Sequence, residues 1–169
     1  MTEKPEISWD LGSGYDLFIS LLVLHDPSTF GLRPSWAAGV RSRLSPGSRD
    51  VLDQAQKVCS LPLYWITTLP EPKDTEHMLS CLKTIPPEER LTRLTEGPVN
   101  FQAAHRILKS VAQKQGWHHT DKLKLREAFR ELNTPPNSRE TQEILNIWKE
   151  PALFGEKLLD SLYEYQKVS

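Results

Sequence analysis

Apolar side chains recur every three to four residues along most of the chain. Within residues 13–25, Leu17, Leu21 and Leu24 share one helical stripe, and other apolar residues cover most of the remaining sides. Such a helix is expected at the centre of a fold. Helical spacing recurs in eight further segments, which are residues 33–44, 45–58, 74–82, 86–94, 101–115, 120–132, 138–148 and 151–169. The pattern predicts an all-α fold of about nine short-to-medium helices.

Residues 61–69 break this spacing. The run from Leu63 to Thr68 is rich in β-branched and aromatic side chains and lies between Pro62 and Pro70. The sequence contains no second strand-like run, so a sheet within one chain is not expected. We therefore expect an extended segment that lies across the helices, or a single strand that pairs with a second copy of the chain.

The last predicted helix has an apolar stripe but no residue that would end it. The stripe consists of Phe154, Leu158, Leu162 and Tyr165, and no glycine, asparagine or proline follows before Ser169. We interpret this segment as a truncated helix whose stripe contacts a further domain or a partner subunit in a homodimer. The alternative is a natural C-terminus that frays.

Length and charge restrict the classes of function. A chain of 169 residues is expected to form one domain, residues 1–169, with 38% hydrophobic and 25% charged residues. Its 21 basic and 22 acidic side chains leave a net charge of −1, and the isoelectric point is about 6.5. Domains that grip nucleic acid are usually strongly basic. Any contact with DNA is therefore expected from a domain absent from this chain.

The sequence is also not expected to contain a membrane span or a signal peptide. The longest apolar run, residues 17–24, is far shorter than a bilayer-spanning helix requires, so no contact with a membrane is expected. Acidic residues crowd the N-terminal region, which disfavours a signal peptide. The two cysteines, Cys59 and Cys81, do not form a spaced disulfide framework, as is usual in a reducing compartment. We expect a cytoplasmic protein.

No catalytic arrangement can be identified from the sequence. It contains neither a Gly-x-Ser-x-Gly nor a His-Glu-x-x-His motif. The segment Gly12-Ser13-Gly14 lacks the preceding strand and following lysine of a phosphate-binding loop, so it is better interpreted as the start of a helix. His118-His119 lies in a connection, where a helix-capping turn is expected. We predict that the chain is not an enzyme and holds no cofactor.

Metal binding has one weak candidate. His77 and Cys81 lie four residues apart on a predicted helix and therefore share a face, as two zinc ligands could. Further ligands would have to come from Cys59 or His118-His119, and no pattern brings these together. Because only two ligands are evident, we expect no metal site. A half-buried cysteine beside a surface histidine explains the pair equally well.

Aromatic and basic residues near the N-terminus suggest a pocket. Most tryptophans belong to a core, but such a cluster with polar groups can also line a ligand site between helices. The only local basic bias is Arg33, Arg41, Arg43 and Arg49. A solvated surface explains it most simply, while one arginine could instead meet an anionic ligand or a carboxylate such as Asp10 or Asp16. The candidate pocket for a small-molecule effector consists of Trp9, Tyr15, Trp36 and Arg41.

The N-terminal third carries a family resemblance. Its residues are Ile7-Ser8-Trp9-Asp10, Tyr15-Asp16-Leu17-Phe18-Ile19-Ser20-Leu21, Phe30-Gly31-Leu32 and Trp36-Ala37-Ala38-Gly39-Val40-Arg41-Ser42-Arg43-Leu44. This pattern resembles the start of a group of bacterial ArsR-like transcriptional regulators. Pro62-Leu63-Tyr64-Trp65, Leu69-Pro70-Glu71-Pro72-Lys73-Asp74 and Phe154-Gly155-Glu156 are similar to later parts of the same domain.

The resemblance implies an all-helical regulatory domain that precedes a winged helix-turn-helix DNA-binding domain. The sequence lacks that winged helix, in agreement with its neutral charge. Metal-sensing members of the family carry their cysteines on the winged domain, so the resemblance assigns no metal to Cys59 or Cys81. We therefore expect an effector-sensing or dimerisation domain of such a regulator. The alternative is a stand-alone protein-protein interaction module with no ligand or DNA role.

Overall fold

The computed structural model describes residues 9–59 and 61–169, which contain helices and no strand. The all-α prediction is confirmed. Ten α-helices and two short 3-10 helices follow one another: α1 (Ser13–His25), η1 (Ser28–Phe30), α2 (Pro34–Arg41), α3 (Pro46–Val58), α4 (Leu63–Thr67), α5 (Thr75–Thr84), α6 (Pro87–Thr95), η2 (Val99–Phe101), α7 (Gln102–Lys114), α8 (His119–Ala128), α9 (Ser138–Trp148) and α10 (Pro151–Val168). No helix in this part of the chain has both the length and the apolar character needed to cross a membrane.

The prediction of an extended segment at residues 61–69 is wrong. The structure places the short helix α4 there, which is the tenth helix that the spacing missed. A lone strand would leave its backbone groups without partners. Here the bonds are local instead: the amide of Ile66 donates to the Pro62 carbonyl at 3.2 Å, and the hydroxyls of Thr67 and Thr68 donate to carbonyls three residues back.

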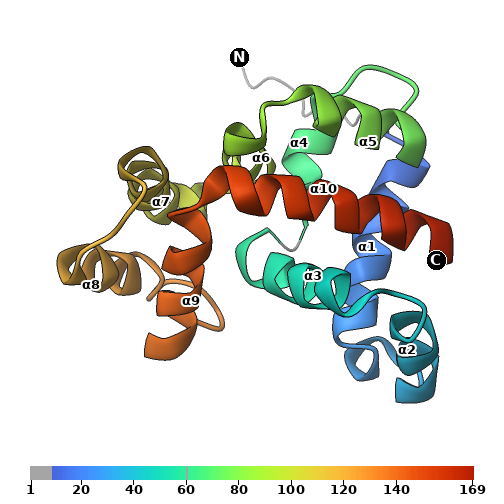
Figure 1. The fold of residues 1–169 in the computed structure, drawn as a ribbon, viewed down its shortest axis with the longest axis horizontal. Coiled ribbons are helices and arrows are strands. Elements are labelled where there is room, and N and C mark those ends of the chain that lie inside the picture. Colours follow the sequence, from blue (N-terminus) through green and yellow to red (C-terminus); the bar gives the residue numbers. More distant parts are fainter. Residues whose placement is uncertain (1–8, 60) are drawn as a thin grey trace, which may run out of the picture.

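Helix α10 is the central element of the molecule. Figure 1 shows it running from α7 and α9 to the opposite end of the fold, with α3 along one side and α5 and α6 along the other. Helix α1 packs against both α3 and α5, so the N-terminal helices close around the C-terminal half of α10. The last helix in the sequence therefore supplies much of the core.

The apolar stripe predicted on this last helix is buried by the chain itself. Phe154, Leu158, Leu162 and Tyr165 are at most 5% exposed, and the Tyr165 hydroxyl donates to the Ser20 hydroxyl at 3.0 Å. The prediction that this stripe faces a partner or a further domain is therefore wrong. Its apolar spacing reflects a helix that is surrounded by α3, α5 and α6.

A close helix crossing fixes α10 against α6. A Cβ at Gly155 would lie 2.1 Å from the Pro87 carbonyl oxygen, so only glycine allows this approach. The buried guanidinium of Arg90 lies at the same junction and donates to the Gly155 carbonyl at 3.0 Å. It also donates to three carbonyls at the end of α5, those of Leu82, Lys83 and Ile85.

Helices α7, α8 and α9 pack on one another at the N-terminal end of α10, apart from the cluster formed by α1–α5 (Figure 1). The rings of His105 and Trp148 meet edge to face within this group, with centroids 6.2 Å apart. Contacts of α7 with α6, and of α9 with α10, join the group to the rest of the chain. The fold thus has two helical parts that share α10.

Candidate functional site

The four residues predicted as an effector pocket do not come together. Trp9 is 87% exposed and Trp36, on α2, is 42% exposed. Neither of the two cavities described below is lined by any of these four residues, and a third, of only about 10 Å³, is lined by Arg41 alone among them. Short sequence separation grouped these residues, but Trp9 precedes α1, Tyr15 lies on α1, and Trp36 and Arg41 lie on α2.

Arg41 has a carboxylate partner within the chain. Its guanidinium donates two hydrogen bonds to Asp53 on α3, at 2.9 and 3.1 Å. The sequence suggested Asp10 or Asp16 as a carboxylate for the local arginines, and the structure gives Asp53 instead. The bidentate pair ties α2 to α3 and leaves Arg41 a structural role.

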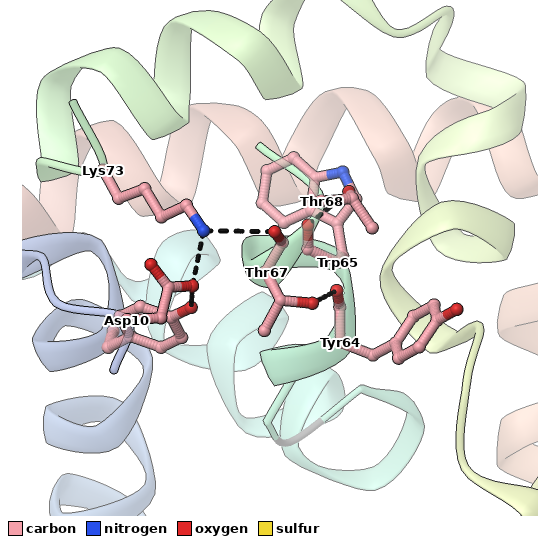
Figure 2. Close-up of polar contacts among 7 residues, drawn as sticks. Asp10, Tyr64, Trp65, Thr67, Thr68 and Lys73 are labelled. Carbon is pink, nitrogen blue, oxygen red and sulfur yellow. Dashed lines mark hydrogen bonds and ion pairs between the residues drawn. The ribbon is translucent and has the colours of Figure 1, made fainter. Parts of the chain in front are cut away.

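A buried lysine binds the residues that precede α1. The ammonium of Lys73, which is only 7% exposed, donates to the Asp10 carboxylate and, at 3.1 Å, to the Thr67 carbonyl (Figure 2). The Tyr15 hydroxyl donates to the same carboxylate. Asp10 thus connects the beginning of α1 to the segment that follows α4.

Electrostatics in this cluster favour the ionised carboxylate. The hydrogen bond from Lys73, and after it the bond from Tyr15, hold the pKa of Asp10 below its usual range. Burial and the neighbouring Asp10 raise the pKa of Tyr15 to about 12, so its phenol stays protonated and keeps donating. All three groups are engaged with one another, and we assign the cluster to stability.

Backbone contacts reinforce this connection. The Gly14 amide donates to the Lys73 carbonyl at 3.0 Å, and a Cβ at Gly12 would lie 2.1 Å from that oxygen. The Ser13 hydroxyl accepts from the Thr75 amide at the start of α5. Gly12-Ser13-Gly14 is therefore a helix start, as predicted. It lies against the 69–74 segment, another part of the family resemblance; Ile7 and Ser8, which also belong to it, lie outside the described residues.

The weak metal candidate remains a pair. The Cys81 sulfur lies 3.5 Å from His77 Nε2, so the two side chains share a face of α5 as their spacing predicts. In residues 9–59 and 61–169, no group of three or more histidine, cysteine, aspartate or glutamate side chains is arranged to hold a metal ion. Burial raises the pKa of the Cys59 thiol to about 12, so this cysteine is a core residue.

The largest cavity described is a groove of about 730 Å³ between α3, α9 and α10. We call it the α3–α10 groove. Its volume falls in the range typical of small-molecule sites. Apolar side chains contributed by all three helices lie along it, namely Val51, Ile147, Leu153 and Phe154. Leu153 is 45% exposed there, so the groove offers apolar surface to a ligand.

Polar contacts join the walls near both ends of α3. At the C-terminal end, Lys57 forms an ion pair with Glu143 of α9 at 2.7 Å. At the N-terminal end, Glu164 of α10 accepts hydrogen bonds from the hydroxyls of Ser45 and Ser48 and from the Ser45 amide. Those bonds, from Ser48 first, lower the pKa of Glu164.

Carboxylates dominate the rim of the α3–α10 groove. Asp50, Glu150 and Asp160 are exposed, and in the described part of the chain none lies within 4.0 Å of a basic group. Glu143 adds a fourth carboxylate, which already pairs with Lys57 and Arg139, and Lys157 is the only basic side chain along the groove lining. The groove therefore combines an apolar floor with a negative rim.

Sequence reasoning missed this groove because its walls come from segments about one hundred residues apart. The acidic residues are scattered through three helices and look like ordinary solvated charges. Leu153 lies beside the stripe of α10 rather than on it, but a single exposed apolar side chain is ordinary, so the sequence carried no clear signal of the groove.

A second cavity, of about 380 Å³, lies between α3, α4 and α6. Its lining is largely apolar and includes Val58, Leu63 and Leu94. The side-chain oxygen of Gln56 is buried at its edge without a hydrogen-bond partner among the described residues. This cavity lies within one helical cluster, whereas the α3–α10 groove lies where the two helical parts meet.

Comparisons of the chain with family models, curated proteins and solved structures find no match. The resemblance to ArsR-like regulators therefore stays a prediction from the sequence.

Proposed function

We propose that this chain is the effector-sensing regulatory domain of an ArsR-like bacterial transcription regulator and that the α3–α10 groove is its sensing site. It would act by binding rather than by catalysis. DNA would be contacted by a winged-helix domain outside this chain. The location of the groove between the two helical parts is the observation that carries the proposal.

A ligand in this groove would touch both parts of the fold. Asp50 and Val51 lie on α3, whereas Asn146 and Ile147 lie on α9. The ion pair between Lys57 and Glu143 links these same walls. Both side chains are more than a third exposed, and exposed ion pairs of this kind stabilise a fold only weakly. Binding energy of ordinary size could therefore break this link and change how α7–α9 sit against α1–α5, which is what a sensory domain requires.

Two resembling segments also form one structural unit. Residues 9–18 and 69–74 are distant in the sequence, yet Asp10 bonds to Lys73 and Gly14 to the Lys73 carbonyl. This contact gives one structural reason why both segments of the resemblance would occur together. The homodimer expected from the sequence would need a surface other than the buried stripe of α10, and it remains part of the proposal.

The gene itself tests the proposal most simply. We expect the reading frame to continue past codon 169 into a basic winged-helix sequence, or a winged-helix protein to be encoded directly beside it and to form a complex with this chain. A stop codon directly after codon 169, with no neighbouring gene for a winged-helix protein, would contradict the proposal that the chain belongs to a transcription regulator. It would leave the alternative of a stand-alone interaction module that uses the same groove.

A further inference from the structure

We propose that the α3–α10 groove binds an amphipathic organic cation, a small molecule with an apolar body and a positively charged centre. This inference rests on the proposed function for the location of the sensing site and adds the chemical class of the effector. It follows from the charges and the apolar surface of the groove.

Charge is the first argument. Three exposed carboxylates along the groove lack a basic partner in the described chain, and a fourth, Glu143, is paired with both Lys57 and Arg139. They come from different elements: Asp50 from α3, Glu150 from the turn before α10, and Asp160 from α10 itself. Only Lys157 opposes them within the lining. The whole chain has a net charge of −1, so the negative rim is a local feature. Clefts lined by one sign of charge concentrate ions of the opposite sign.

Apolar surface is the second argument, and it excludes a simple inorganic ion. The floor is formed by Val51, Ile147 and Phe154, with Leu153 exposed beside them. Carboxylates spread around hydrophobic side chains do not form a compact ligand set, and the described residues contain no group of three or more side chains arranged for a metal. A ligand that satisfies both features needs a hydrophobic body and a diffuse positive charge.

Volume is the third argument, and it favours a small molecule over a bound helix. The groove holds about 730 Å³, whereas a helix with its side chains is about 10–12 Å across and needs a much longer trough. Helix α3 spans about 20 Å at 1.5 Å per residue, and the Lys57–Glu143 and Glu164–Ser45 contacts lie near its two ends. These contacts limit the length of the groove to that of α3.

Two probes of nearly equal shape and opposite charge test the proposal. Tetraphenylphosphonium and tetraphenylborate would each be titrated into the full chain by calorimetry at low ionic strength. We expect the phosphonium ion to bind at least tenfold more tightly than the borate, and its affinity to fall as salt is added. Equal binding of the two, or tighter binding of the borate, would overturn the proposal.

Charge-matched variants locate the binding. We expect the triple variant Asp50→Asn, Glu150→Gln, Asp160→Asn to weaken phosphonium binding by about two- to fivefold for each carboxylate removed, as is usual for exposed charges. The control removes three exposed carboxylates elsewhere, by Glu76→Gln, Glu88→Gln and Glu131→Gln. An equal loss in both variants would show a general charge effect and would contradict a site in the groove.

An apolar substitution separates this site from a purely electrostatic patch. Leu153→Ser should weaken phosphonium binding several-fold, whereas Leu123→Ser, at an exposed leucine on α8, should leave it unchanged. Identical effects would contradict a role of the floor. These binding results do not depend on the reading frame past codon 169. If the cation does not bind, the chain can still be a regulator with another effector. If the frame stops there, the chain can still be a cation-binding module.

Discussion

Individual glycines determine how closely the segments of this fold approach one another. Gly12 has an extended backbone that any residue could adopt, so space alone makes it necessary. A Cβ there would lie 2.1 Å from the Lys73 carbonyl oxygen and 2.7 Å from the Lys73 Cβ. The beginning of α1 could not then lie against the segment before α5.

Substitution of Gly12 measures this contact. We expect Gly12→Ala to lower the free energy of unfolding by about 1–3 kcal/mol, because the backbone must move apart. Gly39→Ala is the control, since Gly39 lies within α2 and nothing surrounds its Cβ position. That change should stabilise the helix by about 0.5–1 kcal/mol. Urea denaturation would measure the free energy of unfolding of both variants. An unchanged value for Gly12→Ala would contradict the account.

Arg90 is a buried arginine whose guanidinium joins α5, α6 and α10 through backbone carbonyl groups. It is 5% exposed and bonds only to carbonyl groups, three at the end of α5 and one on α10. Its charge therefore meets the negative end of a helix rather than a carboxylate. In the sequence it follows Glu88-Glu89 and resembles a surface charge.

Removal of this guanidinium should be costly. We expect Arg90→Met to destabilise the fold by about 3 kcal/mol, because buried carbonyls lose a charged donor. Arg93→Met, at an exposed position on the same helix, should change stability by less than about 0.5 kcal/mol. Thermal unfolding of the two variants measures this difference. Similar losses of stability in both would contradict a stabilising role for the hydrogen bonds of Arg90.

At the scale of elements, the contact between α10 and the start of α3 depends on an ionised carboxylate. Ser48 and Ser45 donate to Glu164 and lower its pKa from the usual 4.5. A lowered folded-state pKa gives stability that is present above the unfolded pKa and is lost as pH falls through the folded value. The contact should therefore weaken in acid.

The variant Glu164→Gln tests this dependence. We expect it to be less stable than the wild type by about 1 kcal/mol near neutral pH, because the amide replaces a charged acceptor. The difference should shrink below pH 4.5, since the wild-type carboxylate then becomes protonated. Urea titrations across this range would contradict the account if the difference were constant, or if Glu76→Gln, at an exposed position, behaved in the same way.

Burial of α10 gives another test at this scale. Leu162 is fully buried, so Leu162→Ala should cost about 2–5 kcal/mol. Leu123→Ala, at a position that is 52% exposed, should cost much less. If the stripe were instead a subunit interface, the substitution would lower the mass seen in sedimentation and leave monomer stability intact.

Helical spacing predicted nine of the ten helices because apolar residues recur every three to four positions within each of them. It failed at α4, whose five residues are too few to show a period and consist of residues typical of strands. The predicted starts of α3 and α5, at residues 45 and 74, lie within one residue of the observed starts, and the side chains of Ser45 and Asp74 accept amide hydrogen bonds there.

The site was much harder to predict than the fold. Trp9, Tyr15, Trp36 and Arg41 were grouped because they lie close in the sequence, but the two cavities of useful size are built from distant segments. The apolar spacing of α10 showed that its stripe is covered. It could not show whether the same chain or a partner covers it, because both surroundings select the same side chains.

At the scale of the whole molecule, α10 connects the two helical parts (Figure 1). It also borders the groove between them. A ligand held by α3 on one side and α9 on the other would alter their separation. This coupling is the central claim, since it makes the groove a sensing site rather than a surface pocket.

The distance between the two parts tests this claim most directly. Spin labels on Ser42→Cys and Lys124→Cys, in a Cys81→Ser background, would report the separation of the α2–α3 turn and α8 by pulsed electron resonance. We expect saturating tetraphenylphosphonium to shift or narrow the distance distribution, and tetraphenylborate at the same concentration to leave it unchanged. A distribution that is identical with and without bound phosphonium would contradict the account.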